Sequence, residues 1–356
     1  MAEMRKREDT VCVSVKGVKI GGGHRIKIQS MTTTKTADVQ STLAQISRLQ
    51  EAGCDIVRVA VSDEADAKAV KQVVSQISLP LVADIHFSPK LAVTAIENGA
   101  DKVRINPGNI GGEKEIKLVA DCIKAHKIPV RVGSNTGSIE PKFLQKYGRS
   151  AEALVESALY NVSMLEKFGV NDIVISVKAS DVPLTVKAYR LLATKTTYPL
   201  HIGVTEAGTT ESGIVKSAVG IGSLLLDGIG DTLRVSLTDD PVKEIAAAKR
   251  ILRACGLEKE YIEVVSCPTC GRCGWESMSL ANKVETYVQT YALPFKIAVM
   301  GCVVNGPGEA KDADLGIAGG ADSCLIFKKG VPFKKVPKAQ AEEEFFKEIR
   351  LMLDER

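Results

Sequence analysis

The sequence has few aromatic residues and no long apolar run. Aromatic residues make up only 4% of its 356 residues, so it offers little of the stacking surface that single-stranded nucleic acids require. No segment reaches the roughly 18 uninterrupted apolar residues of a membrane span, and no apolar run follows the charged N-terminus as in a secretory signal. A net charge of +4 is too small for this length to indicate nucleic acid. We therefore expect a cytoplasmic protein with no nucleic-acid or membrane partner.

Two nucleotide-binding motifs are also missing: no G-x-G-x-x-G opens a helix, and no G-x-x-x-x-G-K-[ST] occurs. The first two thirds of the chain instead repeat one pattern, a short β-branched run followed by a helical stretch. The eight predicted strands lie in residues 26–32, 55–61, 80–87, 101–107, 129–135, 172–178, 199–206 and 232–238. Eight such units predict an α/β fold of the (β/α)8 TIM-barrel type, with an open doubly wound sheet as the alternative.

Polar residues gather near the carboxyl ends of these strands, where a barrel strand without a function is apolar. The positions are Arg58, Asp84, His86, Arg104, Asn106, Arg131, Asn135, Lys178, His201, Glu206, Arg234 and Ser236. A single charged residue usually forms a salt bridge in the barrel, but cations on five different strands would converge on one pocket. Only Asp84 and Glu206 are obvious partners for them. The surplus of positive charge predicts an anionic ligand, most simply a phosphate or diphosphate.

The pattern changes after Cys255, and we expect two domains, a barrel over residues 1–255 and a small α+β domain over 256–356. The sequence GGGH at Gly21–His24 is expected to form a hairpin turn that leads into the barrel. In the second domain, the lysine-rich segment at residues 327–338 is expected to be a solvated loop. An amphipathic helix should follow it over residues 341–356.

Four of the nine cysteines are clustered, and an odd number in a reducing compartment argues against a disulfide framework. Cys267, Cys270 and Cys273 share a Pro/Gly turn, and Cys302 follows a predicted strand. This arrangement is typical of a metal site, and its spacing leaves a structural zinc and an iron–sulfur cluster both open. The anion pocket has no evident pair of catalytic bases and no nucleophile triad. A redox centre would supply the missing chemistry, which favours the cluster.

Eight segments together resemble one family: QSMTTTKT, EAGCDIVRVAV, ADIHF, RINPGNIG, HIGVTEAG, GIGDTLRVSLTDDP, CPTCGR and MGCVVNGPGEA. In this order they are similar to the bacterial two-domain 4-hydroxy-3-methylbut-2-enyl diphosphate synthases, oxidoreductases of the non-mevalonate pathway of isoprene biosynthesis. The resemblance covers residues 10 to about 330. It implies a TIM barrel that binds substrate and a C-terminal [4Fe–4S] domain. It also implies two-electron reductive opening and dehydration of 2-C-methyl-D-erythritol 2,4-cyclodiphosphate, ferredoxin or flavodoxin as electron donor, and a homodimer.

The resemblance also assigns roles to individual residues. It implies cluster ligands at Cys267, Cys270, Cys302 and Glu309, and Glu206 as the catalytic proton donor. The implied substrate-binding residues are Arg58, Arg104, Arg131, Asn135, Lys178, His201, Thr205, Arg234 and Ser236.

Two residues depart from the family pattern. Cys273 is an additional cysteine in the cluster turn. Spacing alone would make it a ligand and leave Glu309 on the surface, whereas the resemblance favours Glu309, because a carboxylate exchanges on iron more easily than a thiolate. Ser134 stands beside Asn135 where the family pattern has an apolar residue. The alternative from another class is a zinc-stapled TIM-barrel lyase or a binder of phosphorylated metabolites.

Overall fold

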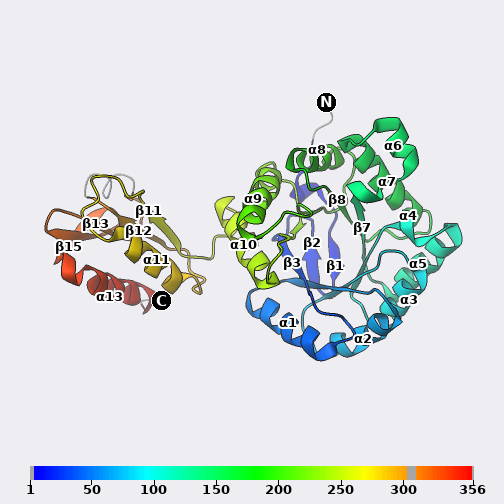
Figure 1. The fold of residues 1–356 in the computed structure, drawn as a ribbon, viewed down its shortest axis with the longest axis horizontal. Helices are drawn as coiled ribbons and strands as arrows, with labels where there is room; N and C mark the ends of the chain where they lie inside the picture. The colour runs from blue at the N-terminus through cyan, green and yellow to red at the C-terminus, as the bar shows by residue number, and fades with distance from the viewer. Residues whose placement is uncertain (1–3, 303–309, 355–356) are drawn as a thin grey trace. The chain divides into compact units, whose positions relative to one another are not determined.

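The structure, a computed structural model, describes residues 4–302 and 310–354. Its chain divides into two compact units, Met1–Cys255 and Gly256–Arg356. Eight parallel strands form the centre of the first unit (Figure 1). They are β3 Lys27–Met31, β4 Ile56–Ala60, β5 Leu81–Asp84, β6 Lys102–Ile105, β7 Val130–Asn135, β8 Ile173–Lys178, β9 His201–Ile202 and β10 Thr232–Leu233. Each lies inside one of the eight predicted ranges.

The strands close into a barrel. Their hydrogen-bonded order is β8-β7-β6-β5-β4-β3-β10-β9, and a bridge between Ile175 and Leu200 joins β8 to the residue just before β9. The prediction of a TIM barrel is confirmed, and the open doubly wound alternative is wrong. Parallel strands in such a barrel direct their carboxyl ends, and the loops that follow them, to one face.

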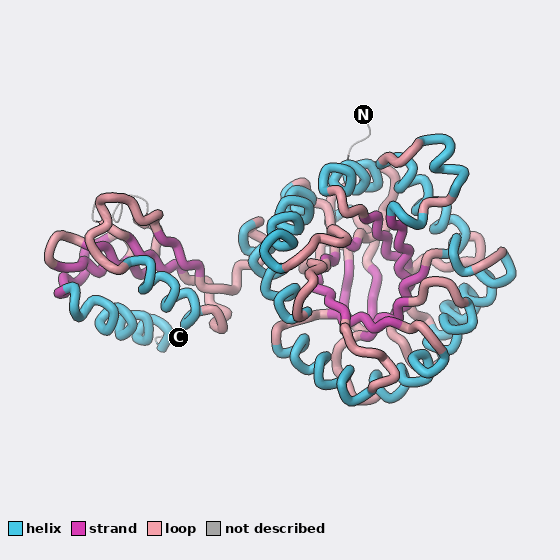
Figure 2. The backbone as a smooth tube through the Cα atoms, viewed as in Figure 1, coloured by secondary structure: helices cyan, strands magenta, loops and turns pink. Residues whose placement is uncertain are grey.

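Helices surround the strands as an outer ring, which Figure 2 shows in cyan around the magenta strands. They are α1 Val39–Glu51, α2 Glu64–Val74, α3 Pro89–Glu97, α4 Pro107–Ile110, α5 Glu113–His126, α6 Pro141–Tyr147, α7 Ala151–Glu166, α8 Val182–Ala193, α9 Thr210–Leu226 and α10 Pro241–Ala254. Side-chain N-caps fix several of the starts. Asp240, for example, accepts a hydrogen bond from the Val242 backbone at 3.0 Å and precedes Pro241. In the described part of the chain, none of the helices has the length and apolar character to span a bilayer.

A short hairpin precedes the barrel and closes its amino-terminal end. It consists of β1 Val13–Val15 and β2 Val18–Ile20, and its turn is at Lys16–Gly17, where both residues have positive φ. Our prediction of the turn at Gly21–His24 is therefore wrong, since that segment follows the hairpin. Valine and isoleucine side chains of the hairpin pack against Ile56, Val82 and Val174 from the barrel strands.

The second unit contains a five-stranded sheet with the order β11-β12-β13-β14-β15. The strands are β11 Glu263–Ser266, β12 Lys296–Met300, β13 Leu315–Gly319, β14 Ser323–Lys328 and β15 Val331–Pro337. Strands β11, β12 and β13 pair in parallel. The β13–β14 and β14–β15 pairs are antiparallel. The lysine-rich segment expected as a loop is thus the second half of a hairpin. Lysines at an exposed edge strand discourage pairing with other chains, which explains a composition that resembles a loop.

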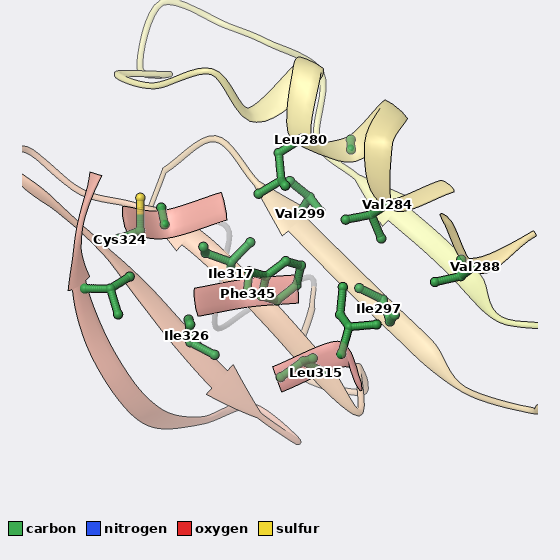
Figure 3. Packing of buried hydrophobic residues seen from close by; sticks show 14 of the residues in the cluster. Leu280, Val284, Val288, Ile297, Val299, Leu315, Ile317, Cys324, Ile326 and Phe345 are labelled. Atoms are coloured by element: carbon green, nitrogen blue, oxygen red, sulfur yellow. The ribbon is translucent and has the colours of Figure 1, made fainter. Parts of the chain in front are cut away.

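Two helices pack on this sheet, α11 Ser277–Val288 and α13 Ala341–Asp354. Figure 3 shows the apolar layer between them and the strands, with Leu280 and Val284 from α11, Phe345 from α13, and Ile297 and Ile317 from the sheet. The alternating residues Ala298 and Met300 lie on the other face of β12, in a smaller apolar cluster that Cys267 also contacts. The first cysteine of the metal-site motif is therefore anchored to the sheet.

We predict that Ile20→Ala destabilises the barrel by about 2–5 kcal/mol, because Ile20 is fully buried in the hairpin's contact with the strands. Urea unfolding followed by far-UV circular dichroism would measure the loss. Lys19→Ala, an exposed position on the same strand, is the matched control and should change the free energy of unfolding little. Equal unfolding curves for the two variants would show that the hairpin does not support the barrel.

Candidate active site

The barrel interior contains a buried ion-pair network centred on Asp84, the last residue of β5. Its Oδ1 lies 3.2 Å from Arg104 Nη1, and its Oδ2 lies 3.6 Å from Arg58 Nε. The three side chains are only 5–11% exposed. Burial alone would raise the pKa of Asp84, but Arg58, His86 and Arg104 together lower it below its ordinary value. Asp84 is therefore an ionised carboxylate shared between two guanidinium groups.

A second carboxylate comes from a helix rather than from a strand end. Glu244 on α10 is 3% exposed and lies 3.1 Å from Arg234 Nη2. It also accepts hydrogen bonds from the Ser30 hydroxyl at 2.8 Å and from the Leu237 backbone at 3.2 Å. These contacts fix the direction of the Arg234 side chain. The thioether of Met31 lies 2.9 Å from Arg58 Nη2 and 3.7 Å from Arg234 Nη1, so the two arginines meet at one sulfur atom.

Two further cations are buried without a carboxylate of their own. Arg131 is 2% exposed, and its Nε and Nη1 have no hydrogen-bond partner among the described residues. Lys178 is 7% exposed, and burial, with the nearby charges of Arg131 and Arg58, lowers its pKa well below the ordinary value. Buried donors without partners are costly, so the Arg131 guanidinium is arranged for a ligand that can accept hydrogen bonds.

Glycines give these cations room. A Cβ at Gly133 on β7 would lie 2.7 Å from Arg104 Nε, and one at Gly203 would lie 2.8 Å from Lys178 Nζ. Any larger residue at either position would displace a charged group. The site therefore requires glycine at these two positions beside the cations.

Two histidines occupy different environments. His201 on β9 is fully buried, its Nδ1 lies 2.7 Å from the Thr232 hydroxyl, and its Nε2 has no partner among residues 4–302 and 310–354. Burial, followed by the charges of Lys178 and Arg131, lowers its pKa well below 6.5, so the ring is neutral. His86 is exposed and lies 3.3 Å from Arg104 Nη1. A neutral imidazole at His201 can accept or donate a hydrogen bond without adding charge.

The structure also reveals site residues that sequence reasoning missed. Lys102 on β6 is fully buried, two residues before Arg104 and on the same side of the strand. Gln29 on β3 is 1% exposed, and both atoms of its amide group lack partners in the described chain. Glu244 was missed because an acidic residue in the first turn of a helix is common on surfaces. A lysine within a β-branched run was the only signal for Lys102.

The remaining predicted site residues, including the predicted proton donor Glu206, lie at or just after the carboxyl ends of strands. Thr205 and the exposed Glu206 come after β9, Ser236 comes after β10, and Asn135 ends β7 in register with Lys178. Within the described residues, neither Glu206 nor Ser236 forms a hydrogen bond or ion pair with the five cations, although both lie at the carboxyl ends of their strands. Glu206 has φ 51°, an uncommon conformation for a residue with a side chain.

Ser134 lies on the opposite face of β7 from Arg131 and Asn135, since successive strand residues alternate in direction. It is completely buried, and its hydroxyl has no partner among the described groups. It therefore faces the surrounding helices rather than the cations.

In the second unit, the cysteine turn lies against the end of β12. Cys267 Sγ accepts a hydrogen bond of 2.9 Å from the Gly301 backbone N–H, and Gly301 directly precedes Cys302. A Cβ at Gly301 would lie 3.3 Å from Cys267 Sγ and 2.8 Å from Cys273 Sγ. The Gly301 backbone therefore connects two of the predicted ligands, because it donates to Cys267 and directly precedes Cys302. A backbone N–H directed at a thiolate sulfur is typical of an iron–sulfur site.

Cys273 has other contacts. Its Sγ lies 3.2 Å from the Trp275 carbonyl oxygen and 3.2 Å from the Ser277 hydroxyl, at the start of α11. Cys270 is exposed. Glu309 lies outside the described residues. In the part of the chain that the structure describes, no three Cys, His, Asp or Glu side chains converge as metal ligands. The donor types and the Gly301 contact nevertheless fit a thiolate-held cluster.

Comparison with known proteins identifies relatives along the whole chain. Residues 10–249 match the GcpE TIM-barrel domain, and residues 263–351 match the GcpE protein C-terminal domain. A protein of Caldanaerobacter subterraneus subsp. tengcongensis named 4-hydroxy-3-methylbut-2-en-1-yl diphosphate synthase (flavodoxin) is 56% identical over 100% of both chains. A protein of Ruminiclostridium cellulolyticum with the same name is 53% identical over 99% of this chain and 100% of its own.

Solved structures with a similar fold are much more distant in sequence. Dihydropteroate synthase from Stenotrophomonas maltophilia has a TM-score of 0.51 and 14% identity, covering 69% of this chain and 98% of its own. Type I 3-dehydroquinate dehydratase from Clostridium difficile has a TM-score of 0.50 and 14% identity, covering 70% of this chain and 98% of its own. These similarities concern the barrel fold alone.

We predict that Asp84→Asn lowers the free energy of unfolding by about 3 kcal/mol, because it leaves two buried arginines without their shared carboxylate. The lowered pKa of Asp84 means that its contribution is complete above the unfolded pKa near 4 and is lost only as pH falls further. The loss should therefore be equal at pH 6 and pH 8 in urea unfolding. Asp121→Asn, which breaks only exposed ion pairs on α5, should cost less than about 1 kcal/mol. Similar losses in both variants would contradict this account.

Proposed function

Because the chain belongs to the GcpE family, we propose that it converts 2-C-methyl-D-erythritol 2,4-cyclodiphosphate to 4-hydroxy-3-methylbut-2-enyl diphosphate in isoprenoid biosynthesis. The reaction adds two electrons and two protons, opens the ring and releases water. The observation that carries the proposal within the structure is the surplus of buried cations. Among the described residues, five largely buried basic side chains have two carboxylates, Asp84 and Glu244, as ion-pair partners, and several of their donors have no partner. Full-length identity to named synthases favours this function over a zinc-stapled lyase.

The cations are proposed to bind the diphosphate. Arg131 has donors without a partner among the described residues and would contact phosphate oxygens directly, and Lys178, whose pKa is lowered by burial and by Arg131 and other nearby cations, would bind beside it. Arg58, Arg104 and Arg234 are already oriented by Asp84 and Glu244, so they would bind with little further loss of side-chain freedom. Each arginine can offer paired N–H groups that match the geometry of phosphate. The anion would in turn reduce the repulsion among the cations.

The polar residues around the cations would position the rest of the substrate. Asn135, His201, Thr205 and Ser236 are proposed to hydrogen-bond to the hydroxyl and phosphate oxygens. Glu206 is proposed as the proton donor to the oxygen that leaves as water. Its exposure in the loop after β9 keeps it accessible to substrate, and its carboxyl group can exchange protons with solvent between turnovers.

The electrons require a redox cofactor, for which we propose a [4Fe–4S] cluster held by Cys267, Cys270, Cys302 and Glu309. When bound, such a cluster supplies single electrons at low potential. The Gly301 N–H that donates to Cys267 would stabilise negative charge on that sulfur. Cys273 is assigned a structural role, because its thiol already contacts Trp275 and Ser277 at the start of α11.

The partners complete the proposal. The relatives' printed names specify flavodoxin, so flavodoxin is the proposed electron donor, with ferredoxin as the alternative. A homodimer is also proposed. A cytoplasmic location fits a protein with nine cysteines and no disulfide between described residues, because thiolate ligands need a reducing compartment.

We predict that Glu206→Gln retains substrate binding and the visible absorbance of the cluster but lowers kcat by about 10²–10⁴-fold, the usual contribution of a general acid. Anaerobic turnover with a chemical reductant would measure the loss. Glu211→Gln in the first turn of α9 makes the same change of charge at a position outside the predicted site, so it serves as the control. Full turnover in the Glu206 variant would remove this residue from proton transfer.

A second prediction separates ligand from structural cysteines. Protein purified without oxygen should contain about four iron and four sulfide per chain. Cys267→Ser should lose most of both, whereas Cys273→Ser should retain them, as should Cys122→Ser on α5. Iron and sulfide assays with electron paramagnetic resonance would measure this. If Cys273→Ser loses the cluster and Glu309→Ala keeps it, the proposed ligand set is wrong. Stoichiometric zinc without sulfide would refute the proposed function.

A further inference from the structure

Lys102 lies fully buried inside the barrel, near its amino-terminal floor and close to the cations of the proposed substrate site. It is the first residue of β6, between β5 and β7, and is in register with Val82. Val82 belongs to the apolar layer that packs on the amino-terminal hairpin. Arg104, two residues later on the same face of β6, binds Asp84 one level higher. The Lys102 side chain is therefore enclosed in the barrel between the apolar floor residues and the charges of Arg131 and Arg58, which act on its amino group.

The amino group of Lys102 has no protein partner. The residue is fully buried, and its Nζ makes no hydrogen bond within residues 4–302 and 310–354. Burial, followed by the charges of Arg131 and Arg58, lowers its pKa to about 7. A buried lysine without a partner destabilises a fold that an apolar side chain of the same length would stabilise. Packing alone therefore gives no reason for a lysine here.

We propose that Lys102 is a further substrate-binding residue, whose ammonium group pairs with a phosphate of the bound diphosphate. This inference rests on the proposed function and adds a contact beside the cations already assigned. Lys102 is largely neutral in the unliganded barrel above pH 7. An anion next to Nζ favours the charged form, so binding at pH 8 is accompanied by uptake of a proton.

Several neighbouring groups also carry or change charge. Asp84 on β5 remains ionised in its pairs with Arg58 and Arg104, and Arg131 on β7 remains a cation. Burial and nearby cations lower the pKa values of Lys178 on β8 and His201 on β9, so an anion beside them would favour the charged form of both. The total proton uptake therefore includes several groups. The difference between the protein and a Lys102 variant isolates the contribution of Lys102.

The test is calorimetric titration of the anaerobically purified full chain with inorganic diphosphate, without divalent cations, at pH 8. Measurement in two buffers with different ionisation enthalpies gives the number of protons taken up per anion. Lys102→Met should bind about 10- to 100-fold more weakly, the effect of losing a hydrogen bond to a charged group. On binding diphosphate, this variant should also take up fewer protons than the unchanged protein, by up to about one per anion bound. Lys117→Met, on the exposed surface of α5, is the matched control and should behave as the unchanged protein.

Thermal unfolding of the same proteins separates binding from a structural role. Without ligand, Lys102→Met should be at least as stable as the unchanged protein, because it removes a buried amino group that has no partner among the described residues. With diphosphate, its stabilisation should be smaller. A structural lysine would show the reverse, with lower stability and unchanged ligand-induced stabilisation. Lys102→Arg keeps a permanent charge and should bind diphosphate more tightly than Lys102→Met, with less proton uptake than the unchanged protein.

Equal affinity and equal proton uptake in Lys102→Met and the unchanged protein would overturn this inference and leave the proposed function intact. Failure of the unchanged protein to bind diphosphate would instead contradict the proposed function. The two failures are therefore distinguishable in one set of titrations.

Discussion

Repulsion among buried positive charges is the constraint on which the rest of this barrel depends. Five basic side chains project from different strands into a space where water cannot fully screen them. Asp84 offsets part of that repulsion between two arginines, and Glu244 offsets another part at Arg234. Arg131 keeps a positive charge that no carboxylate among the described residues pairs with, and burial together with this excess charge lowers the pKa of Lys178. Without a ligand, this repulsion lowers the stability of the barrel, and the same charges raise its affinity for an anion, as is common at functional sites.

Asp84 and Glu244 also hold the side chains of their arginine partners in place before a ligand binds. Glu244 comes from α10 and holds both Ser30 on β3 and the Arg234 side chain, so a helix, the first barrel strand and the last are connected through one side chain. The Met31 sulfur between Arg58 and Arg234 adds a soft, polarisable contact without charge. Glycines beside Arg104 and Lys178 supply the space. The pocket is thus organised before any anion arrives, which reduces the entropy lost on binding.

Sequence reasoning predicted the barrel because its eight strands are short β-branched runs between strong helix signals, and it predicted the cations because charge is rare in such runs. It failed where a residue's surroundings differ from its local pattern. Glu244 looks like any acid at a helix start, Lys102 occupies a strand position normally apolar, and residues 331–337 have loop-like composition but form an edge strand. No local rule could relate Glu206 to the cations, since their relation depends on loop conformation. The roles of Glu206 and of Glu309, which lies outside the described residues, remain predictions.

The amino-terminal hairpin restricts how a ligand can enter and leave the barrel. Its apolar side chains fill the floor, with Val13, Val15 and Ile20 packed against the strands. A charged metabolite would lose its hydration in such a layer, so among the described elements the end of the barrel where the strands have their carboxyl ends is the expected entrance. Substrate and product would then share one route. The product has to depart before the next molecule arrives, and accumulated product would compete directly with fresh substrate for the empty barrel.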